Sequence, residues 1–178
     1  MASQFHSLVT SITGAEAVKA AIQSVPARAR SRGLWRALGD EIKGQTEERF
    51  DLGEEPSGKK WPTSWRVKLG LGGGPTLVKT RDMERSMTVN INDAGGELVV
   101  PKVYAATHQF GATIEPVSAK VLKFRLGNKG NKPNFVFARK VTIPARPFLG
   151  FSARNIEVIQ QVAAEYVMKQ AASQGAAP

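Results

Sequence analysis

The chain has 178 residues, 42% of them hydrophobic, no cysteine and a formal net charge of +10. This length and apolar content suit one domain with its own core, and the lack of cysteine excludes disulfides, thiolate metal sites and cysteine nucleophiles. The first residues carry neither a basic start nor a continuous apolar run, and no stretch approaches the ~18 apolar residues of a membrane span, so we expect no membrane partner.

The positive charge is concentrated in the C-terminal two-thirds of the chain. Residues 61–178 carry sixteen Lys or Arg against seven acids, whereas residues 1–60 carry nine against eight. Between Pro116 and Ile156 there are nine basic residues and no acid. A local excess of this kind suits binding to nucleic acid or to an acidic protein surface.

Two amphipathic helices are predicted near the N-terminus. The first covers residues 15–25 with Thr13 as a candidate cap, and residues 1–14 before it are expected to be flexible. The second begins at Pro26, because a first helical turn tolerates proline, and runs towards Phe50. The apolar positions that recur at helical spacing are Val18, Ala21, Ile22, Val25, Leu34, Leu38 and Ile42.

Residues 51–76 are rich in Gly, Pro, Ser and Lys and predict a long loop. Its two indoles, Trp61 and Trp65, are either local core anchors or interface residues, and both interpretations stay open. The Gly and Lys spacing of residues 53–60 imitates a phosphate-binding loop, but a lysine stands where a metal-binding hydroxyl is needed. We therefore predict no nucleotide site in this loop.

The next stretch predicts a helical turn, a hairpin and a second helical turn. Residues 80–86 can hold the first turn, and residues 87–91 then alternate apolar and polar side chains as a half-buried strand does. Residues 98–100 return as the partner strand after a glycine-rich turn. Residues 104–109 are too short and too rich in alanine for a strand, so we predict one helical turn stopped by Gly111.

A second hairpin follows, and it carries most of the local positive charge. Residues 121–126 alternate, and one return strand places Phe135, Phe137, Val141 and Ile143 on a shared face. The connecting residues 127–133 form a polar, basic tip. Because the phenylalanines alternate with basic residues, we expect them to face the core.

Residues 143–151 read Ile-Pro-Ala-Arg-Pro-Phe-Leu-Gly-Phe and predict a stiff, extended rod, since each proline fixes φ and disfavours helix at the residue before it. The rod is either a rigid crossover into the last helix or a preorganised docking surface. Ser152 can cap that last helix, and residues 171–178 look like a frayed tail. We predict one α+β domain over residues 15–170, with the N-terminal helices and the C-terminal helix packed on a mainly antiparallel sheet built from the two hairpins.

The sequence offers no catalytic constellation. The two histidines are His6 and His108, no nucleophile elbow is present, and no acidic cluster resembles a calcium or magnesium loop. We therefore predict that the protein is not an enzyme and carries no metal or cofactor, and that His108 has a packing or interface role.

Ordered motifs across most of the chain resemble the phage virion morphogenesis family, the tail-completion and neck proteins of Mu-like tailed bacteriophages. They are Leu-Trp-Arg-Ala-Leu-Gly at 34–39, Arg-Phe at 49–50, Pro-Ser-Gly-Lys-Lys-Trp at 56–61, Leu-Val-Lys-Thr at 77–80, Ser86, Tyr-Ala at 104–105, His-Gln-Phe-Gly at 108–111 and Ile-Pro-Ala-Arg-Pro-Phe-Leu-Gly at 143–150. Two positions depart from the family pattern. Arg81 stands where the family usually has glycine, and Asn155 stands where it often has an acid.

The resemblance implies a structural virion protein at the head-tail junction, a neck, tail-completion or tail-terminator protein, assembled in the bacterial host cytoplasm. It implies a ring around the DNA path, with a hexamer as the natural count, whose partners are other copies of the chain, the neighbouring connector and tail proteins, and packaged DNA bound without sequence specificity. The alternative is a free, non-enzymatic nucleic-acid-binding module that uses the basic 116–154 segment.

Two groups of residues are predicted to make these contacts. The subunit-interface group comprises Trp61, His108, Gln109, Phe110, Pro144, Arg146, Pro147, Phe148 and Leu149. The group facing DNA or an acidic partner comprises Lys123, Lys129, Lys132, Arg139 and Lys140.

Overall fold

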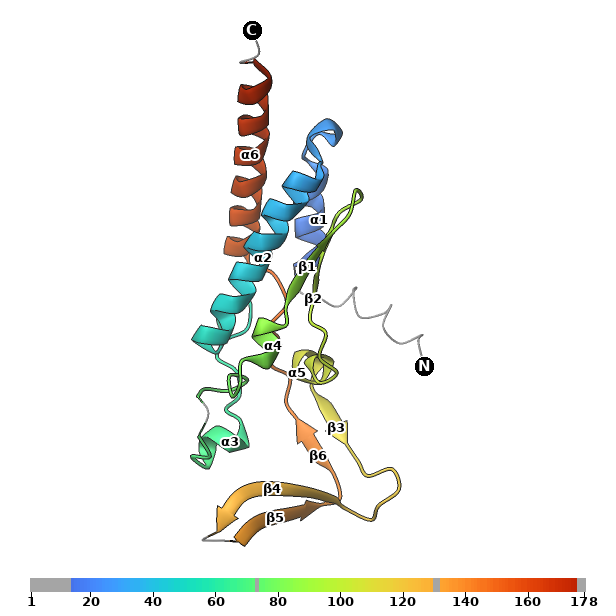
Figure 1. Cartoon of the computed structure of the whole chain (residues 1–178), viewed down its shortest axis with the longest axis vertical. Coiled ribbons are helices and arrows are strands. Elements are labelled where there is room, and N and C mark those ends of the chain that lie inside the picture. The colour runs from blue at the N-terminus through green and yellow to red at the C-terminus, as the bar shows by residue number, and fades with distance from the viewer. Residues whose placement is uncertain (1–13, 73, 130–131, 176–178) are drawn as a thin grey trace.

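The computed structural model describes residues 14–72, 74–129 and 132–175, and it is elongated (Figure 1). Three helices, α1, α2 and α6, lie together at one end, and the β4 and β5 hairpin lies at the other. The predicted flexible segment 1–14 falls outside the described residues except for Gly14, as does the candidate cap Thr13. The α+β class predicted from the sequence is confirmed.

The N-terminal helices are α1 (Ala15–Gln23) and α2 (Arg32–Leu52), joined by a short 3₁₀ turn, η2 (Ala27–Ala29). The predicted start of the second helix at Pro26 is therefore wrong by six residues. Ser31 explains the later start, because its side-chain oxygen accepts a hydrogen bond from the backbone N–H of Leu34 at 3.4 Å and so caps α2.

The last helix, α6 (Ala153–Gly175), packs against α1 and α2. Its N-terminus forms a reciprocal cap, in which the N–H of Asn155 donates to Ser152 Oγ at 3.2 Å and the N–H of Ser152 donates to Asn155 Oδ1 at 2.9 Å. The helix continues through 171–175, where a frayed tail was expected. The first core cluster comprises the buried Val18, Val25, Ala29, Leu34, Trp35, Leu38, Ile159 and Ala163, so the predicted apolar faces of these helices are confirmed.

The predicted first hairpin exists and lies against α2. Strands β1 (Thr88–Ile91) and β2 (Gly96–Val99) pair antiparallel, with Val89 opposite Leu98. Gly39 makes the close packing possible, since a Cβ atom there would lie 2.4 Å from Cγ1 of Val89. A glycine inside a helix costs helix stability but here admits a strand.

Three short helices connect the two ends of the molecule: α3 (Trp65–Lys68), within the predicted long loop, α4 (Asp82–Arg85) and α5 (Ala105–Phe110). The last two are the helical turns predicted for these stretches. Gly111 ends α5 with a φ of 73°, as expected for a glycine stop.

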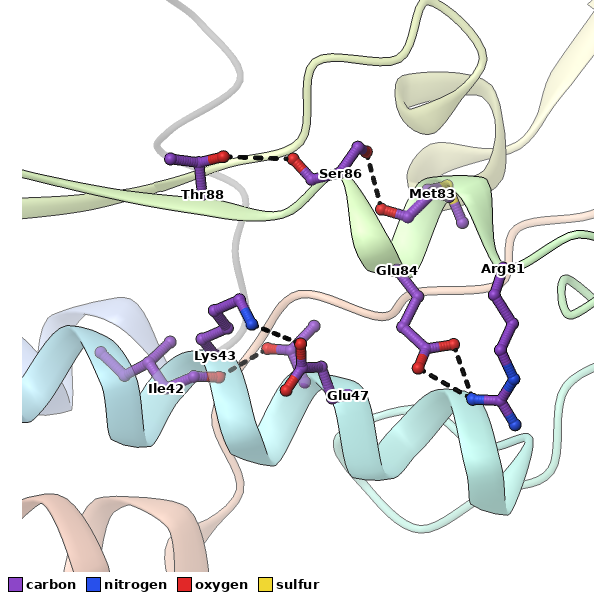
Figure 2. A network of polar contacts seen from close by, with 9 residues as sticks. Ile42, Lys43, Glu47, Arg81, Met83, Glu84, Ser86 and Thr88 are labelled. Carbon is purple, nitrogen blue, oxygen red and sulfur yellow. Dashed lines mark hydrogen bonds and ion pairs between the residues drawn. The ribbon is translucent and has the colours of Figure 1, made fainter.

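Arg81, which precedes α4, has a φ of 57°, a left-handed conformation that glycine adopts without strain. Its Nη1 donates to both carboxylate oxygens of Glu84, at 2.8 and 3.0 Å, and Figure 2 shows this contact beside the Lys43 to Glu47 pair on α2. Its Nη2 donates to Asp51 Oδ1 at 2.7 Å, and these hydrogen bonds to Asp51 and Glu84 raise the pKa of Arg81. The arginine at the family's usual glycine position thus keeps the turn and links α4 to the end of α2.

The strands do not form one sheet. Within the described residues they form three separate two-stranded ladders, β1 with β2, β3 (Ala112–Ile114) with β6 (Val141–Ile143), and β4 (Leu122–Lys129) with β5 (Lys132–Ala138). The single return strand predicted for the second hairpin breaks at Arg139 and Lys140, because its second half pairs with β3, which the sequence analysis missed. The prediction of one sheet from two hairpins is therefore corrected.

Candidate assembly sites

The rod of residues 143–151 ends in a second core cluster near the middle of the molecule. Phe148 is 1% exposed and its ring lies 5.4 Å from that of Phe50, which also meets the ring of Trp61 edge-on at 5.5 Å. The same cluster includes the buried Val78, Met83, Met87 and Ala105. Of the two open interpretations for the indoles, Trp61 is a local core anchor, whereas Trp65 is 72% exposed.

The backbone of the rod is held by side chains instead of by a strand. Gln109 Oε1 accepts from the N–H groups of Phe148 and Leu149, both at 3.0 Å, and Gln109 Nε2 donates to the carbonyl of Leu149 at 2.9 Å. Trp61 Nε1 donates to the carbonyl of Pro147 at 2.9 Å. Backbone N–H and C=O groups removed from water need hydrogen-bond partners. Gln109 supplies them to the rod, as the backbone of a neighbouring strand would in a sheet.

Arg49 on α2 completes this clamp from the opposite side. Its Nη1 donates to the Phe148 carbonyl at 3.0 Å, and its Nη2 donates to Asn155 Oδ1 at 2.7 Å. Burial lowers the pKa of Arg49, and the nearby Glu48 and Glu54 act against this shift. Asn155 therefore meets the buried guanidinium of Arg49 with a neutral amide oxygen.

Arg146 and His108 line a cleft of about 280 Å³ together with Arg66, Lys79 and Tyr104. The backbone N–H of Arg146 donates to the His108 carbonyl at 2.6 Å, and its Nε donates to the Pro62 carbonyl at 2.8 Å. Burial lowers the pKa of Arg146. Arg146 therefore braces its own chain, and its predicted contact with a neighbouring subunit stays a prediction.

His108 is expected to make the protein less stable in acid. Burial, and then the positive charge of Arg146, lower the pKa of His108 below its usual range. Below about pH 6.5 the unfolded chain binds a proton that the folded chain does not, so the free energy of unfolding falls with pH until the lower folded pKa is reached.

Urea unfolding of the wild type and of His108→Gln across about pH 7 to 5 checks this expectation, and the difference between the two removes the contribution of the carboxylates. The wild type should lose more stability than the variant over this window. Parallel stability curves would show that His108 does not carry the dependence.

The second candidate site is the arm, which we define as β4 and β5. Lys123 stands opposite Phe137 and Arg125 opposite Phe135, so these four side chains share one face. Phe137 is 60% exposed and Phe135 41%, and the Lys123 ammonium lies 4.0 Å from the centre of the Phe135 ring. The prediction that these phenylalanines face the core is therefore wrong, because no layer of the described chain covers this face.

The predicted charged residues lie on or next to the arm. Lys129 and Lys132 occupy paired positions at the end of its ladder, and Arg139 and Lys140 are exposed between β5 and β6. Among the described residues, Lys123, Arg139 and Lys140 form no ion pair with any acid. These cations are thus available to a partner.

The predicted interface group divides between interior and surface. Trp61, Gln109, Arg146 and Phe148 are buried within the subunit, and their assignment as contact residues stays a prediction. Phe110 and Pro144 are exposed, and His108, Pro147 and Leu149 are half-buried, so these five stay surface candidates. Arg49 is a clamp residue that was not predicted, although its place in the Arg-Phe motif beside Phe50 was a signal.

The profile of the phage virion morphogenesis family matches residues 13–168. The chain belongs to this family. The resemblance found in the sequence is thereby confirmed, and with it a role in virion morphogenesis. Four of the motifs of this family member, at 49–50, 56–61, 108–111 and 143–150, supply the clamp residues Arg49, Trp61 and Gln109 and the rod that they hold.

Two relatives illustrate the relationship. This family member is 25% identical over 140 residues to the putative capsid assembly protein G of Escherichia phage Mu, covering 75% of its own length and 77% of that protein. It is 28% identical over 139 residues to the Mu-like prophage FluMu G protein 2 of Haemophilus influenzae, covering 78% and 80%. No solved structure matches the chain.

Residues 14–72, 74–129 and 132–175 contain no helix with the length and apolar character needed to cross a membrane. The same residues bring no three acidic or histidine side chains together as metal ligands.

Proposed function

We propose that this protein is a structural component of the head-tail junction of a tailed phage, where copies form a ring, most simply a hexamer, that completes the tail and joins it to the capsid. Family membership supports an assembly role, and the name of the Mu relative, a putative capsid assembly protein, agrees with it. The partners in this proposal are other copies of the chain, the adjoining connector and tail proteins, and the DNA that passes through the ring.

The observation that carries the proposal is the uncovered face of the arm. A two-stranded hairpin alone is marginally stable in water, and this one exposes two phenylalanines at the end of the molecule farthest from the C-terminus of α6 (Figure 1). Apolar surface next to charged groups is typical of protein contact sites. The arm thus has the composition of a segment that another protein covers after assembly.

The alternative function is nucleic-acid binding, and one observation favours it. Exposed aromatic rings interleaved with cations also suit stacked bases and phosphates, and the arm combines Phe135 and Phe137 with Lys123. Binding of this kind would be independent of sequence and would weaken steeply with salt. A ring that surrounds DNA could use part of the same face.

Replacing Phe135 and Phe137 by serine should leave the subunit folded but abolish the joining of heads to tails. Loss of exposed side chains changes the free energy of unfolding by only about 0.5 kcal/mol, whereas loss of interface aromatics removes the main source of contact energy. The measurement is complementation of a phage lacking the gene, with electron microscopy of the lysate and mass spectrometry of purified particles.

Met168→Ser is the matched control, since Met168 is 64% exposed on α6, away from the arm. It should complement normally. If the wild-type chain were absent from purified particles, the role as a virion component would be wrong. Normal virions from the Phe135 and Phe137 double variant would show that the arm is not needed for assembly.

A further inference from the structure

We infer that the arm of one subunit docks into a groove between α2 and α6 of the next copy of the chain. The inference rests on the proposed ring, and it names which surfaces meet. The groove is formed by the C-terminal half of α2, the turn at residues 53–58 and the first turns of α6, and it encloses about 380 Å³. We call it the acceptor groove.

The acceptor groove has more hydrogen-bond acceptors than donors. Its lining includes Glu41, Glu48, Glu54 and Glu55. Glu54 pairs with Lys60 at 2.9 Å, but among the described residues Glu48 and Glu55 form no ion pair. Gln45 Oε1 in the same lining is buried without a hydrogen-bond partner.

Two arginines also line the groove, and they do not cancel this imbalance. Arg49 is buried and already donates to Phe148 and Asn155, so it cannot turn towards the carboxylates. Arg154 is exposed and is the other cation of the lining. The carboxylates of Glu48 and Glu55, which form no ion pair among the described residues, therefore suit a partner that brings cations.

The arm brings those cations together with apolar surface. Lys123 on the arm and Lys140, two residues after the end of β5, are exposed and pair with no acid of the described chain. The apolar part of the groove, which includes Leu52 at 47% exposure and Val158, can receive the phenylalanines. The two surfaces are complementary in charge and in polarity, which sets partner choice at protein interfaces.

The arm and the acceptor groove are two different surfaces of one chain, as a ring of identical subunits requires. The arm lies at one end of the elongated molecule, and the C-terminal end of α2, where the acceptor groove lies, is nearer its middle, beside α4 (Figure 1). A contact between two different surfaces of one chain is heterologous, and it closes into a ring when its rotation allows. Each subunit would then give its arm to one neighbour and receive the arm of the other.

A charge exchange between the two surfaces tests the inference on the full-length chain. The arm variant carries Lys123→Glu and Lys140→Glu, and the groove variant carries Glu48→Lys and Glu55→Lys. Because Glu48 lies beside the buried Arg49 and opposes its pKa shift, Glu55→Lys alone serves as a second groove variant. Circular dichroism establishes that each is folded, and sedimentation velocity measures association.

Each variant alone should associate at least about tenfold more weakly than the wild type, since like charges meet in every contact. Mixing the arm and groove variants one to one should restore assembly, because each arm then meets a groove of opposite charge. Rising salt should weaken the wild-type assembly.

Three results would overturn the inference. If the wild type associates but the variants associate equally well, or if mixing restores nothing, the arm docks elsewhere and the proposed ring stands. If the wild type stays monomeric at every concentration, copies do not meet at this surface. If the wild type is monomeric, retards duplex DNA and is absent from virions, the docking inference and the proposed structural function both fail. The nucleic-acid-binding alternative then replaces them.

Discussion

Replacing Gln109 by leucine is expected to lower the free energy of unfolding by roughly 3 kcal/mol or more. The leucine has nearly the same size but leaves the N–H groups of Phe148 and Leu149 and the carbonyl of Leu149 without partners. Each buried backbone group that loses its partner costs about 1 to 3 kcal/mol; here one buried and two partly buried groups lose theirs. Urea unfolding followed by circular dichroism measures the change.

Gln160→Leu on α6 is the matched control, because this glutamine is exposed. Its effect should stay within about 0.5 kcal/mol. A loss below about 1 kcal/mol for Gln109→Leu would mean that water can replace the amide at the rod, contrary to the clamp described above.

The second large effect is expected for Phe148→Ala, which should lose about 3 to 5 kcal/mol of stability. Phe148 is 1% exposed, and its ring packs against Phe50 at the point where the rod enters the core. Prolines that stiffen the rod and side chains that hold its backbone limit the collapse of the cavity, so the cost should lie near the upper end of the range.

Phe137→Ala on the arm is the control for the same change of residue type. Phe137 is 60% exposed, so the purified monomer should keep its stability within about 0.5 kcal/mol while assembly weakens. Equal losses of monomer stability at the two positions would contradict the division between an interior clamp and an exposed arm.

Local patterns in the sequence were sufficient for most helices and for the first hairpin. Apolar spacing placed α1, α2 and α6 and their buried faces, since helical periodicity depends only on neighbours three and four residues apart. The same reasoning failed for the second hairpin. Alternation of Phe135 and Phe137 with cations shows that one face differs from the other, but not which molecule covers the apolar face.

The two departures from the family pattern had no explanation in the sequence. Arg81 lies in a left-handed turn and binds Asp51, thirty residues earlier, while Asn155 caps α6 and accepts from Arg49. Each side chain serves a contact between distant segments. Contacts between distant segments produce no periodic pattern in the amino-acid sequence, so pattern analysis does not predict them.

The sequence by itself determined the family, the α+β class, the helical faces and the stiffness of residues 143–151, because motif order, apolar period and proline geometry are all local properties. Only the tertiary structure decided that Trp61, Gln109, Arg146 and Phe148 belong to the interior. Their partners stand far away in the chain, 40 residues for Gln109 with Leu149 and 99 residues for Arg49 with Phe148. A buried polar group must find a hydrogen bond wherever the fold supplies one, and that choice is made by packing in three dimensions.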